Sequence, residues 1–160
     1  MEFIENISKK EFENFVSTNN LKGHFMQSYY LGDVSKNKKC KPHYVGIKED
    51  GELIATALLL EKNLISKYSF FYCPRGFVCD YKDTELLETF TSHLKKYCKK
   101  RNGIFLRIDP DIKLQNLNCE GNVLEGLDNH DLVNSLIKLG YKHKGFNKNF
   151  ENSQPRYTFR

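Results

Sequence analysis

Residues that could do chemistry are scattered along this sequence rather than grouped in known catalytic or metal-binding patterns. The cysteines form no C-x-x-C pair and are odd in number, which argues against a zinc site or a disulfide framework. They are Cys40, Cys73, Cys79, Cys98 and Cys119. We interpret them as reduced thiols, mostly in core or half-core positions. A nucleophilic cysteine paired with one of the five histidines stays open, although no motif supports it.

The stretch 73–80, Cys-Pro-Arg-Gly-Phe-Val-Cys-Asp, lies between a predicted strand and a predicted helix. Enzymes that use acetyl-CoA hold its pyrophosphate at such a place with a glycine-rich turn. Here one glycine is followed by a bulky phenylalanine and then by an acid. We therefore expect no coenzyme A site and no other cofactor. The sequence also lacks the G-x-x-x-x-G-K-[ST], H-E-x-x-H and G-x-S-x-G motifs.

Charge and hydropathy place few limits on function. Lysine and arginine number 25 against 20 acidic residues, a formal net charge of +5. This excess permits contact with phosphates of RNA or of a nucleotide-linked substrate, but on charge alone we favour a solvated lysine-rich surface. No apolar run approaches the roughly 20 residues that span a bilayer, and the acidic first residues do not form a signal peptide. We expect a cytoplasmic protein.

The N-terminal half predicts a strand, two helices and a three-stranded antiparallel meander. Ser8 and Glu11 form a capping box that begins a helix ending at Asn19-Asn20. Residues 25–36 predict a second short helix. The three strands cover 43–48, 52–60 and 64–72, and Asp50-Gly51 marks the first hairpin.

The C-terminal half predicts a helix, a buried strand, a last helix and a final strand. Asp83 caps the clearest helix, whose apolar stripe recurs at helical spacing up to Gly103. Residues 104–108 predict a buried strand, and 111–127 predict irregular structure. Asp128 is expected to cap a helix with Leu132, Val133, Leu136 and Ile137 inward, ending at Gly140. Extended chain is expected at 141–150 and 157–159. This order predicts a mixed α/β, GNAT-like acyltransferase fold, with a mainly antiparallel central sheet flanked by helices.

Four stretches, in this order, resemble the N-terminal half of the FemABX family of peptidyltransferases. They are Phe-Met-Gln-Ser-Tyr-Tyr-Leu-Gly-Asp-Val (25–34), Pro-Arg-Gly-Phe-Val-Cys-Asp-Tyr (74–81), Phe-Leu-Arg-Ile-Asp-Pro-Asp (105–111), and Leu-Gly-Tyr (139–141) followed by Gln-Pro-Arg-Tyr-Thr (154–158).

The resemblance implies an activity and its partners. Family members have two GNAT-like domains and move an aminoacyl group from tRNA to an amine of the stem peptide of a muramyl precursor. Residues 1–160 would form the N-terminal, precursor-binding domain. The second domain, expected to meet the aminoacyl-tRNA, is absent from this chain, which alone is expected to be inactive. The acceptor could be nucleotide-linked or lipid-linked, and a lipid-linked acceptor permits peripheral membrane contact. No metal is expected.

The resemblance also implies three precursor-binding residues and no catalytic one. Asp109 matches an acidic position that faces the precursor, where its carboxylate could accept hydrogen bonds; a turn cap is the alternative. Lys36 lies near the place of a lysine that meets the pyrophosphate, or else is a solvated surface lysine. Arg75 could contact a substrate phosphate or be structural. Arg156 is interpreted as structural, and the sequence assigns no acid–base role to His143.

Two other classes of function remain open. One is a different GNAT-like N-acyltransferase with a small acyl donor, which a phosphate-cradling turn would favour. The other is a non-catalytic module that binds RNA or the precursor.

Overall fold

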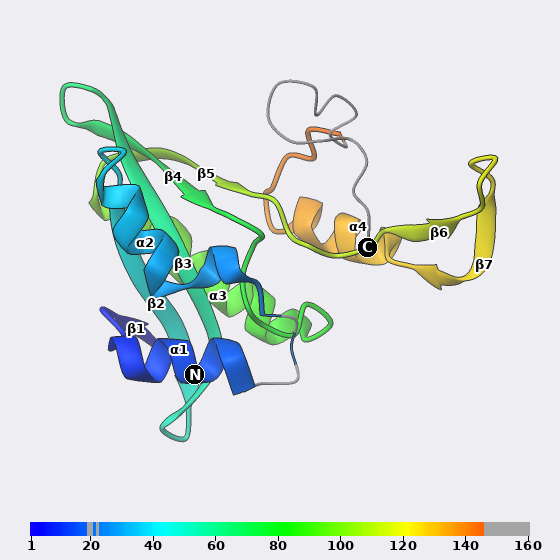
Figure 1. Ribbon diagram of the computed structural model, residues 1–160, viewed down its shortest axis with the longest axis horizontal. Helices are drawn as coiled ribbons and strands as arrows, with labels where there is room; N and C mark the ends of the chain where they lie inside the picture. Colours follow the sequence, from blue (N-terminus) through cyan, green and yellow to red (C-terminus); the bar gives the residue numbers. More distant parts are fainter. Residues whose placement is uncertain (19–20, 22, 146–160) are drawn as a thin grey trace.

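The computed structural model describes residues 1–18, 21 and 23–145 (Figure 1). Its N-terminal elements are β1 (Glu2–Glu5), α1 (Lys9–Thr18), the 3-10 helix η1 (Phe25–Gln27), α2 (Tyr29–Lys36), β2 (Lys41–Glu49), β3 (Glu52–Ile65) and β4 (Tyr68–Cys73). The remaining elements are α3 (Thr84–Lys100), β5 (Gly103–Ile108), β6 (Gln115–Leu117), β7 (Val123–Asp128) and α4 (His130–Lys138).

The central sheet has the order β1-β2-β3-β4-β5. The first three pairs are antiparallel, and β4 pairs with β5 in parallel through the crossover helix α3. Parallel neighbours need such a crossover, whereas antiparallel ones can be joined by tight turns. Helices α1 and α2 lie on one face of the sheet and α3 on the other (Figure 1). The predicted mixed α/β fold with a mainly antiparallel sheet is confirmed.

Two hydrophobic cores hold the layers together. The larger one joins α3 to the sheet, and the stripe predicted for this helix is fully buried at Leu87, Phe90 and Leu94. The smaller core centres on Phe12 of α1, which packs edge-on against Tyr29 of α2 and against a tyrosine of β2. The face of the sheet near α1 and α2 is therefore fixed by aromatic contacts.

Several local signals act as predicted. Asp83 accepts a hydrogen bond from the Leu86 amide at 2.9 Å and caps α3. Asp50 and Gly51 both have positive φ and form the β2–β3 turn. Ser8 accepts from the Glu11 amide at 3.3 Å. The second half of that capping box is replaced, because the Glu11 carboxylate forms an ion pair with Lys48.

The strand boundaries around the second hairpin were predicted wrongly. Leu64 and Ile65 belong to the end of β3, and β4 begins only at Tyr68. A register irregularity between Asn63 and Ile65 obscures the alternation that would mark the turn. The predicted helix over 25–36 is likewise divided into η1 and α2 by Ser28, which caps α2.

The interpretation of 104–108 as a buried strand is wrong. Ile104 and Phe105 are 60% and 51% exposed, because β5 pairs with β4 alone within the described part of the chain. An apolar run cannot distinguish a central strand from an edge strand, since the partner comes from elsewhere in the sequence.

The region after β5 also differs from expectation. Residues predicted as irregular contain the β6–β7 hairpin. Asn129, not Asp128, occupies the N-cap of α4, and Asp128 instead accepts hydrogen bonds from the His130 amide and ring. In α4, Leu132 and Leu136 pack on the larger core, whereas Ile137 is 48% exposed.

Some expectations concern residues that the structure does not describe. Arg156 and the strand at 157–159 lie there, as does the second half of the extended stretch 141–150, whose described part, 141–145, contains no strand. No helix in the described ranges is long and apolar enough to cross a membrane.

Candidate functional site

The carboxyl ends of the parallel strands β4 and β5 bring Asp109 and Arg75 together. Asp109 follows β5 directly. Its Oδ1 accepts a hydrogen bond from the Arg75 amide at 2.7 Å, and its Oδ2 accepts one from the Tyr72 hydroxyl at 2.9 Å. Both carboxylate oxygens thus hold the end of β4 in place, and the carboxylate is only partly buried.

The turn after β4 is held in one conformation by its contacts. Arg75 and Gly76 have φ of 61° and 72°. A Cβ on Gly76 would lie 2.9 Å from the Cα of Pro110 and 2.5 Å from the Tyr81 hydroxyl. Glycine is therefore required both by the left-handed backbone and by the close approach of the chain after β5.

Gln27 ties this turn to the middle of the sheet. Its side chain is fully buried. The amide Nε2 donates to the Pro74 carbonyl at 2.6 Å, and Oε1 accepts from the Leu58 amide at 2.7 Å. The glutamine thus bridges β3 and the chain after β4. Sequence reasoning missed this residue, although it lies within the stretch 25–34 that carries the family resemblance.

Electrostatics mark the same cluster as a place where cations and a carboxylate meet. Burial raises the pKa of Tyr72 to about 12, helped by the hydrogen bond to Asp109 and by its charge. The positive charges of Arg107 and Arg75 oppose this rise. The Arg107 guanidinium lies 5.8 Å from the centre of the Tyr72 ring. Two arginines and one carboxylate therefore surround a neutral phenol.

An aromatic surface leads away from this cluster along β4 and β5. Phe70 and Phe105 stack with ring centres 5.3 Å apart, and Phe105 is half exposed. Tyr72 and Arg107 share this face, as the strand register requires. Helix α2 packs on β2 and β3 instead. Phe70, Tyr72, Phe105 and Arg107 form what we call the uncovered strip.

Lys36 does not join the cluster. It lies at the C-terminal end of α2 and forms an exposed ion pair with Asp33 at 2.8 Å. The other end of α2 follows η1, whose Gln27 reaches Pro74. Eight helical residues span about 12 Å, so Lys36 and Asp109 could be contacted together only by an extended ligand.

The amides that a pyrophosphate would need after β4 are already used. The backbone N–H groups of residues 75–78 donate, in chain order, to the Asp109 carboxylate, the Cys73 carbonyl, the Tyr81 hydroxyl and the Thr56 carbonyl. The Asp83 carboxylate also occupies the N-terminus of α3, where a phosphate would gain most from the helix dipole. This arrangement does not suit coenzyme A.

The buried cysteines serve packing rather than catalysis. Burial raises the pKa of the Cys73 thiol well above its usual value and that of Cys79 and Cys98 to about 12, whereas a nucleophile needs a thiolate. Cys40 is half-buried and Cys119 is exposed. Among the described residues, no three His, Cys, Asp or Glu side chains are grouped so as to hold a metal ion.

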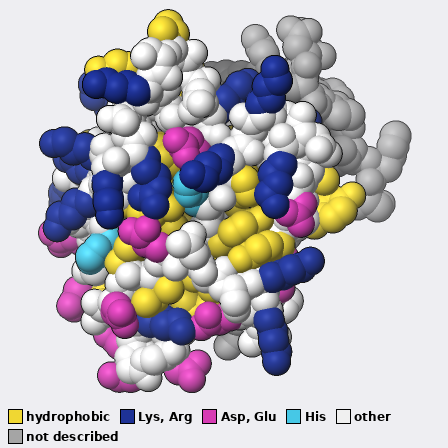
Figure 2. Space-filling view, turned by 90° about the vertical axis from the view of Figure 1, so that its left-hand side faces the viewer, with side chains coloured by type: hydrophobic (Ala, Val, Ile, Leu, Met, Phe, Trp, Pro, Cys, Tyr) yellow, Lys and Arg dark blue, Asp and Glu magenta, His cyan; other side chains and the backbone are white. Residues whose placement is uncertain are grey.

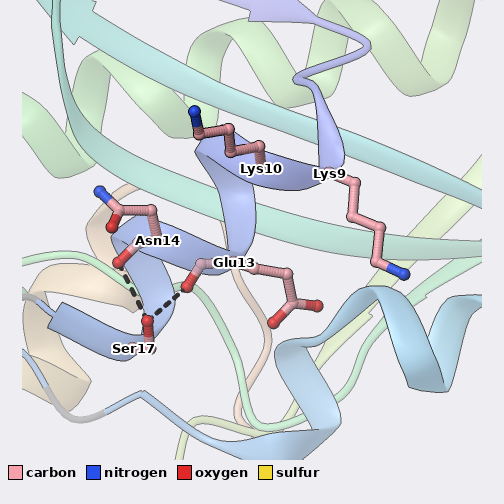
Figure 3. Close-up of a pocket in the computed structure, with 5 residues that line it drawn as sticks. All are labelled: Lys9, Lys10, Glu13, Asn14 and Ser17. Atoms are coloured by element: carbon pink, nitrogen blue, oxygen red, sulfur yellow. Dashed lines mark hydrogen bonds between the residues drawn. The ribbon is translucent and has the colours of Figure 1, made fainter.

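A shallow hollow runs along the outer side of α1 (Figure 3). Its lining residues are Lys9, Lys10, Glu13, Asn14 and Ser17. The Ser17 hydroxyl bonds to the carbonyls of Glu13 and Asn14, and the Glu13 carboxylate accepts from the Tyr29 amide. Ser17 thus serves α1 itself and Glu13 the start of α2, and the hollow is open to solvent.

The fold matches that of solved acetyltransferases with low sequence similarity to this chain. An aminoglycoside antibiotic 6′-N-acetyltransferase from Acinetobacter haemolyticus aligns over 97% of this chain and 100% of its own, with a TM-score of 0.56 and 12% identity. An acetyltransferase from Trypanosoma brucei gives a TM-score of 0.53 with 10% identity, over 99% of both chains. At these identities the likeness shows the fold alone, and that fold is the GNAT type.

The chain belongs to the FemAB family, whose sequence model matches residues 7–160. It is 37% identical over 147 residues to the aminoacyltransferase FemA of Staphylococcus epidermidis and 33% identical to that of Staphylococcus aureus. Each match covers 91% of this chain and 35% of the relative. A crystal structure of FemX superposes with a TM-score of 0.75 at 28% identity, over 91% of this chain and 33% of that one. The chain thus spans about a third of the length of these relatives.

Proposed function

We propose that this chain forms the acceptor-binding N-terminal part of an aminoacyltransferase that moves an amino acid from aminoacyl-tRNA to the stem peptide of a peptidoglycan precursor. The observation that carries the proposal is the cluster of Asp109, Arg75 and Arg107 at the end of the uncovered strip. Family membership supports the transferase chemistry. In this proposal residues 1–160 are the first of two GNAT-like domains, the second binds the tRNA end, and the protein works in the cytoplasm.

Different residues of the site would bind different parts of an extended precursor. The arginines and Lys36 supply positive charge for phosphate oxygens, and the stacked phenylalanines offer a flat apolar surface for sugar or peptide groups. Asp109 holds the Arg75 turn and lies close to the arginines. Its carboxylate can also attract the acceptor amine of the peptide, since charged acceptors make the stronger hydrogen bonds.

The reaction needs positioning more than a new functional group. The acceptor amine attacks the ester carbonyl of the aminoacyl-tRNA, a C–N bond forms, the ester C–O bond breaks and the tRNA leaves with a free hydroxyl. The amine loses one proton and the leaving hydroxyl gains one. Holding the two substrates together supplies much of the rate, and charge stabilisation of the oxyanion supplies more. No residue of this chain is assigned a catalytic role.

Calorimetric titration with the soluble nucleotide-linked muramyl pentapeptide tests the proposal. Saturable binding should weaken in Asp109→Ala, Arg75→Ala and Lys36→Ala. Losing a charged hydrogen bond costs about 1.5–3 kcal/mol, so each affinity should fall by roughly 10- to 100-fold. The exposed α4 residues Asp131 and Lys138 provide matched controls, since their alanine variants change the same charges elsewhere.

Acetyl-CoA distinguishes the rival acyltransferase function. The committed amides of residues 75–78 predict no saturable binding of this donor. A chain that binds acetyl-CoA and ignores the precursor would be a different N-acyltransferase. A folded chain that binds neither acetyl-CoA nor the precursor would contradict the proposed site. Unchanged precursor affinity in the three alanine variants would contradict it as well.

A further inference from the structure

A two-stranded ribbon projects from the sheet at the end opposite Asp109. The last residue of β3 that pairs with β2 is Glu61, opposite Lys41, yet β3 continues to Ile65. Four further residues at about 3.3 Å each extend roughly 13 Å. Figure 1 shows this β3–β4 hairpin reaching beyond the connection between α2 and β2. We call residues 64–68 the hairpin tip.

The hairpin tip exposes large apolar side chains. Ile65 is 80% exposed, and Leu64 and Tyr68 are 48% and 47% exposed. They are adjacent around a turn at Ser66, whose φ is 54°. Burying such side chains is worth about 25 cal/mol per Å². Their shared exposure at a projecting point therefore indicates a surface that is covered when the protein works.

Basic side chains surround the base of the hairpin tip. The α3–β5 connection lies there because the Ser69 amide donates to the Asn102 carbonyl at 3.1 Å. The acids of this region are already engaged: Glu61 with His43 and Ser69, and Glu5 with Arg101. Figure 2, which views the molecule from this side, shows lysines and arginines gathered over the upper half of the face. We call the following residues the basic end: Lys38, Lys39, Lys41, Lys62, Lys67, Lys99, Lys100 and Arg101.

The combination of an apolar hairpin tip with a lysine-rich basic end favours binding to a lipid surface over binding to RNA. Aliphatic side chains such as Leu64 and Ile65 gain free energy in the headgroup and acyl boundary of a bilayer, and lysines beside them are drawn to anionic lipids. Sites for single-stranded RNA instead stack bases on aromatic rings and arginine planes. The basic end holds seven lysines and one arginine, and Tyr68 is the aromatic residue of the hairpin tip.

We propose that the hairpin tip and the basic end together bind the surface of a membrane that contains anionic lipids. Leu64, Ile65 and Tyr68 enter the headgroup region, and the lysines contact lipid phosphates. β4 leads away from this surface, and its six residues place the Asp109 cluster roughly 20 Å above it. The inference does not depend on the identity of the precursor, because membrane binding is measured without it.

A single tryptophan tests the apolar contact directly. The chain contains no tryptophan, so Ile65→Trp reports on the hairpin tip alone. Its emission should shift to the blue with vesicles containing about equal amounts of phosphatidylglycerol and phosphatidylcholine, and brominated acyl chains should quench it. Ile137→Trp, at another exposed apolar position on α4, should show neither change. Unchanged emission from the Ile65→Trp chain would overturn the proposal.

Variants that remove charge or apolar side chains test the rest of the surface. In a flotation assay, Lys62→Gln with Lys67→Gln should lower the vesicle partition coefficient by at least about tenfold, since each lysine near an anionic surface contributes a factor of roughly five. Lys9→Gln with Lys10→Gln on α1 should change it little. Leu64→Ser with Ile65→Ser should also weaken binding. All these positions are exposed, so the variants should fold, as circular dichroism can verify.

The same assay separates lipid from RNA. Added salt should release the chain from anionic vesicles, and phosphatidylcholine vesicles alone should not hold it. Equal partition into neutral vesicles would show that the basic end plays no part. The opposite result would be a parent chain that binds bulk tRNA in a salt-sensitive way but does not bind vesicles. If the Lys62→Gln, Lys67→Gln variant then lost tRNA binding, the basic end would be an RNA site and the proposal would be overturned.

Discussion

At the scale of single residues, the candidate site depends on two side chains that each make at least two hydrogen bonds. Asp109 holds the β4 turn through both carboxylate oxygens, and Gln27 holds the same turn from the other side. Neither contact is local in sequence. The position of Arg75 is therefore a consequence of hydrogen bonds that reach across the sheet.

Replacing Asp109 by asparagine should lower the pKa of Tyr72. The pKa of about 12 reflects burial first, and then the hydrogen bond to Asp109 and its charge. Asparagine removes the charge, while Arg107 and Arg75 continue to favour the phenolate. Spectrophotometric titration, with Tyr72→Phe identifying the signal of this residue, should show an earlier transition. Asp131→Asn is the control, and an unchanged Tyr72 transition would contradict the described geometry.

Replacing Gln27 by leucine should destabilise the whole chain. The Leu58 amide and the Pro74 carbonyl would lose their partner in the interior, and a buried unsatisfied group costs about 1–3 kcal/mol. Urea denaturation should therefore show a free energy of unfolding lower by about 2 kcal/mol or more. Asn134→Ala, at an exposed position of α4, should stay within about 0.5 kcal/mol. Equal stabilities would show that the Gln27 bridge contributes little.

At the scale of elements, the turn between β4 and α3 decides what the site can bind. In a glycine-rich version of this turn the amides would be free to meet a phosphate. Here residues 75–78 bond to the protein itself, and Gly76 packs against Pro110. The turn is therefore a support for Arg75 rather than a phosphate cradle.

Comparing two glycines isolates this packing. Gly76 and Gly51 both have positive φ, at 72° and 86°, but a Cβ at Gly51 would meet nothing within 4 Å. Gly51→Ala should cost only the conformational term of about 1 kcal/mol. Gly76→Ala should cost clearly more in thermal denaturation and should also weaken precursor binding. A similar cost for both would mean that the turn can move away from Pro110 freely.

At the scale of the whole molecule, a buried polar network joins the sheet to α3 far from the candidate site. The His43 ring bonds to the Glu61 carboxylate at 2.7 Å and to the Tyr97 hydroxyl at 2.8 Å. Arg101 stacks on the Tyr97 ring at 3.6 Å from its centre. The network lies below the basic end and fixes the far end of α3 on the sheet.

This network should make stability depend on pH. Burial lowers the pKa of His43 below 6.5; Glu61 opposes the shift, and Lys41 and Arg101 add to it. The unfolded chain therefore binds a proton more readily than the folded one. The contribution of neutral His43 is fully present above about pH 6.5 and is lost as the pH falls from there toward the folded pKa.

Urea denaturation at several pH values measures this effect. The free energy of unfolding should fall as the pH drops below about 6.5, and His43→Gln should flatten that part of the curve. His130→Gln changes an exposed histidine and should leave the slope in place. A wild-type slope that persists in the His43→Gln chain would assign the dependence to other groups.

Much of the fold could be predicted from the sequence, because its signals are local. The stripe of α3, the Asp83 cap and the Asp50-Gly51 turn each depend on residues a few positions apart. The order of elements then restricted the fold to the GNAT type, which the structure and its neighbours confirm. The family resemblance, read from four short stretches, is confirmed by the match over residues 7–160.

The candidate site was predictable only in part. Asp109 and Arg75 were named, and the structure brings them together; Lys36 was named, and it lies apart. Their roles in binding stay predictions. Gln27 and Arg107 were not singled out, because a polar residue beside apolar ones gives no sign of what it will contact. The edge position of β5 was missed for the same reason.

The sequence by itself therefore determined the α3 helix, the Asp50-Gly51 turn and the family, since caps, periodicity and turn residues act within a few positions. Only the tertiary structure decided where the polar groups meet. The bonds of Gln27 to Pro74 and of Asp109 to Tyr72 and Arg75 join residues 34 to 47 positions apart. The contacts of Asp109 require the parallel pairing of β4 with β5, which brings the carboxyl ends of these strands to one edge.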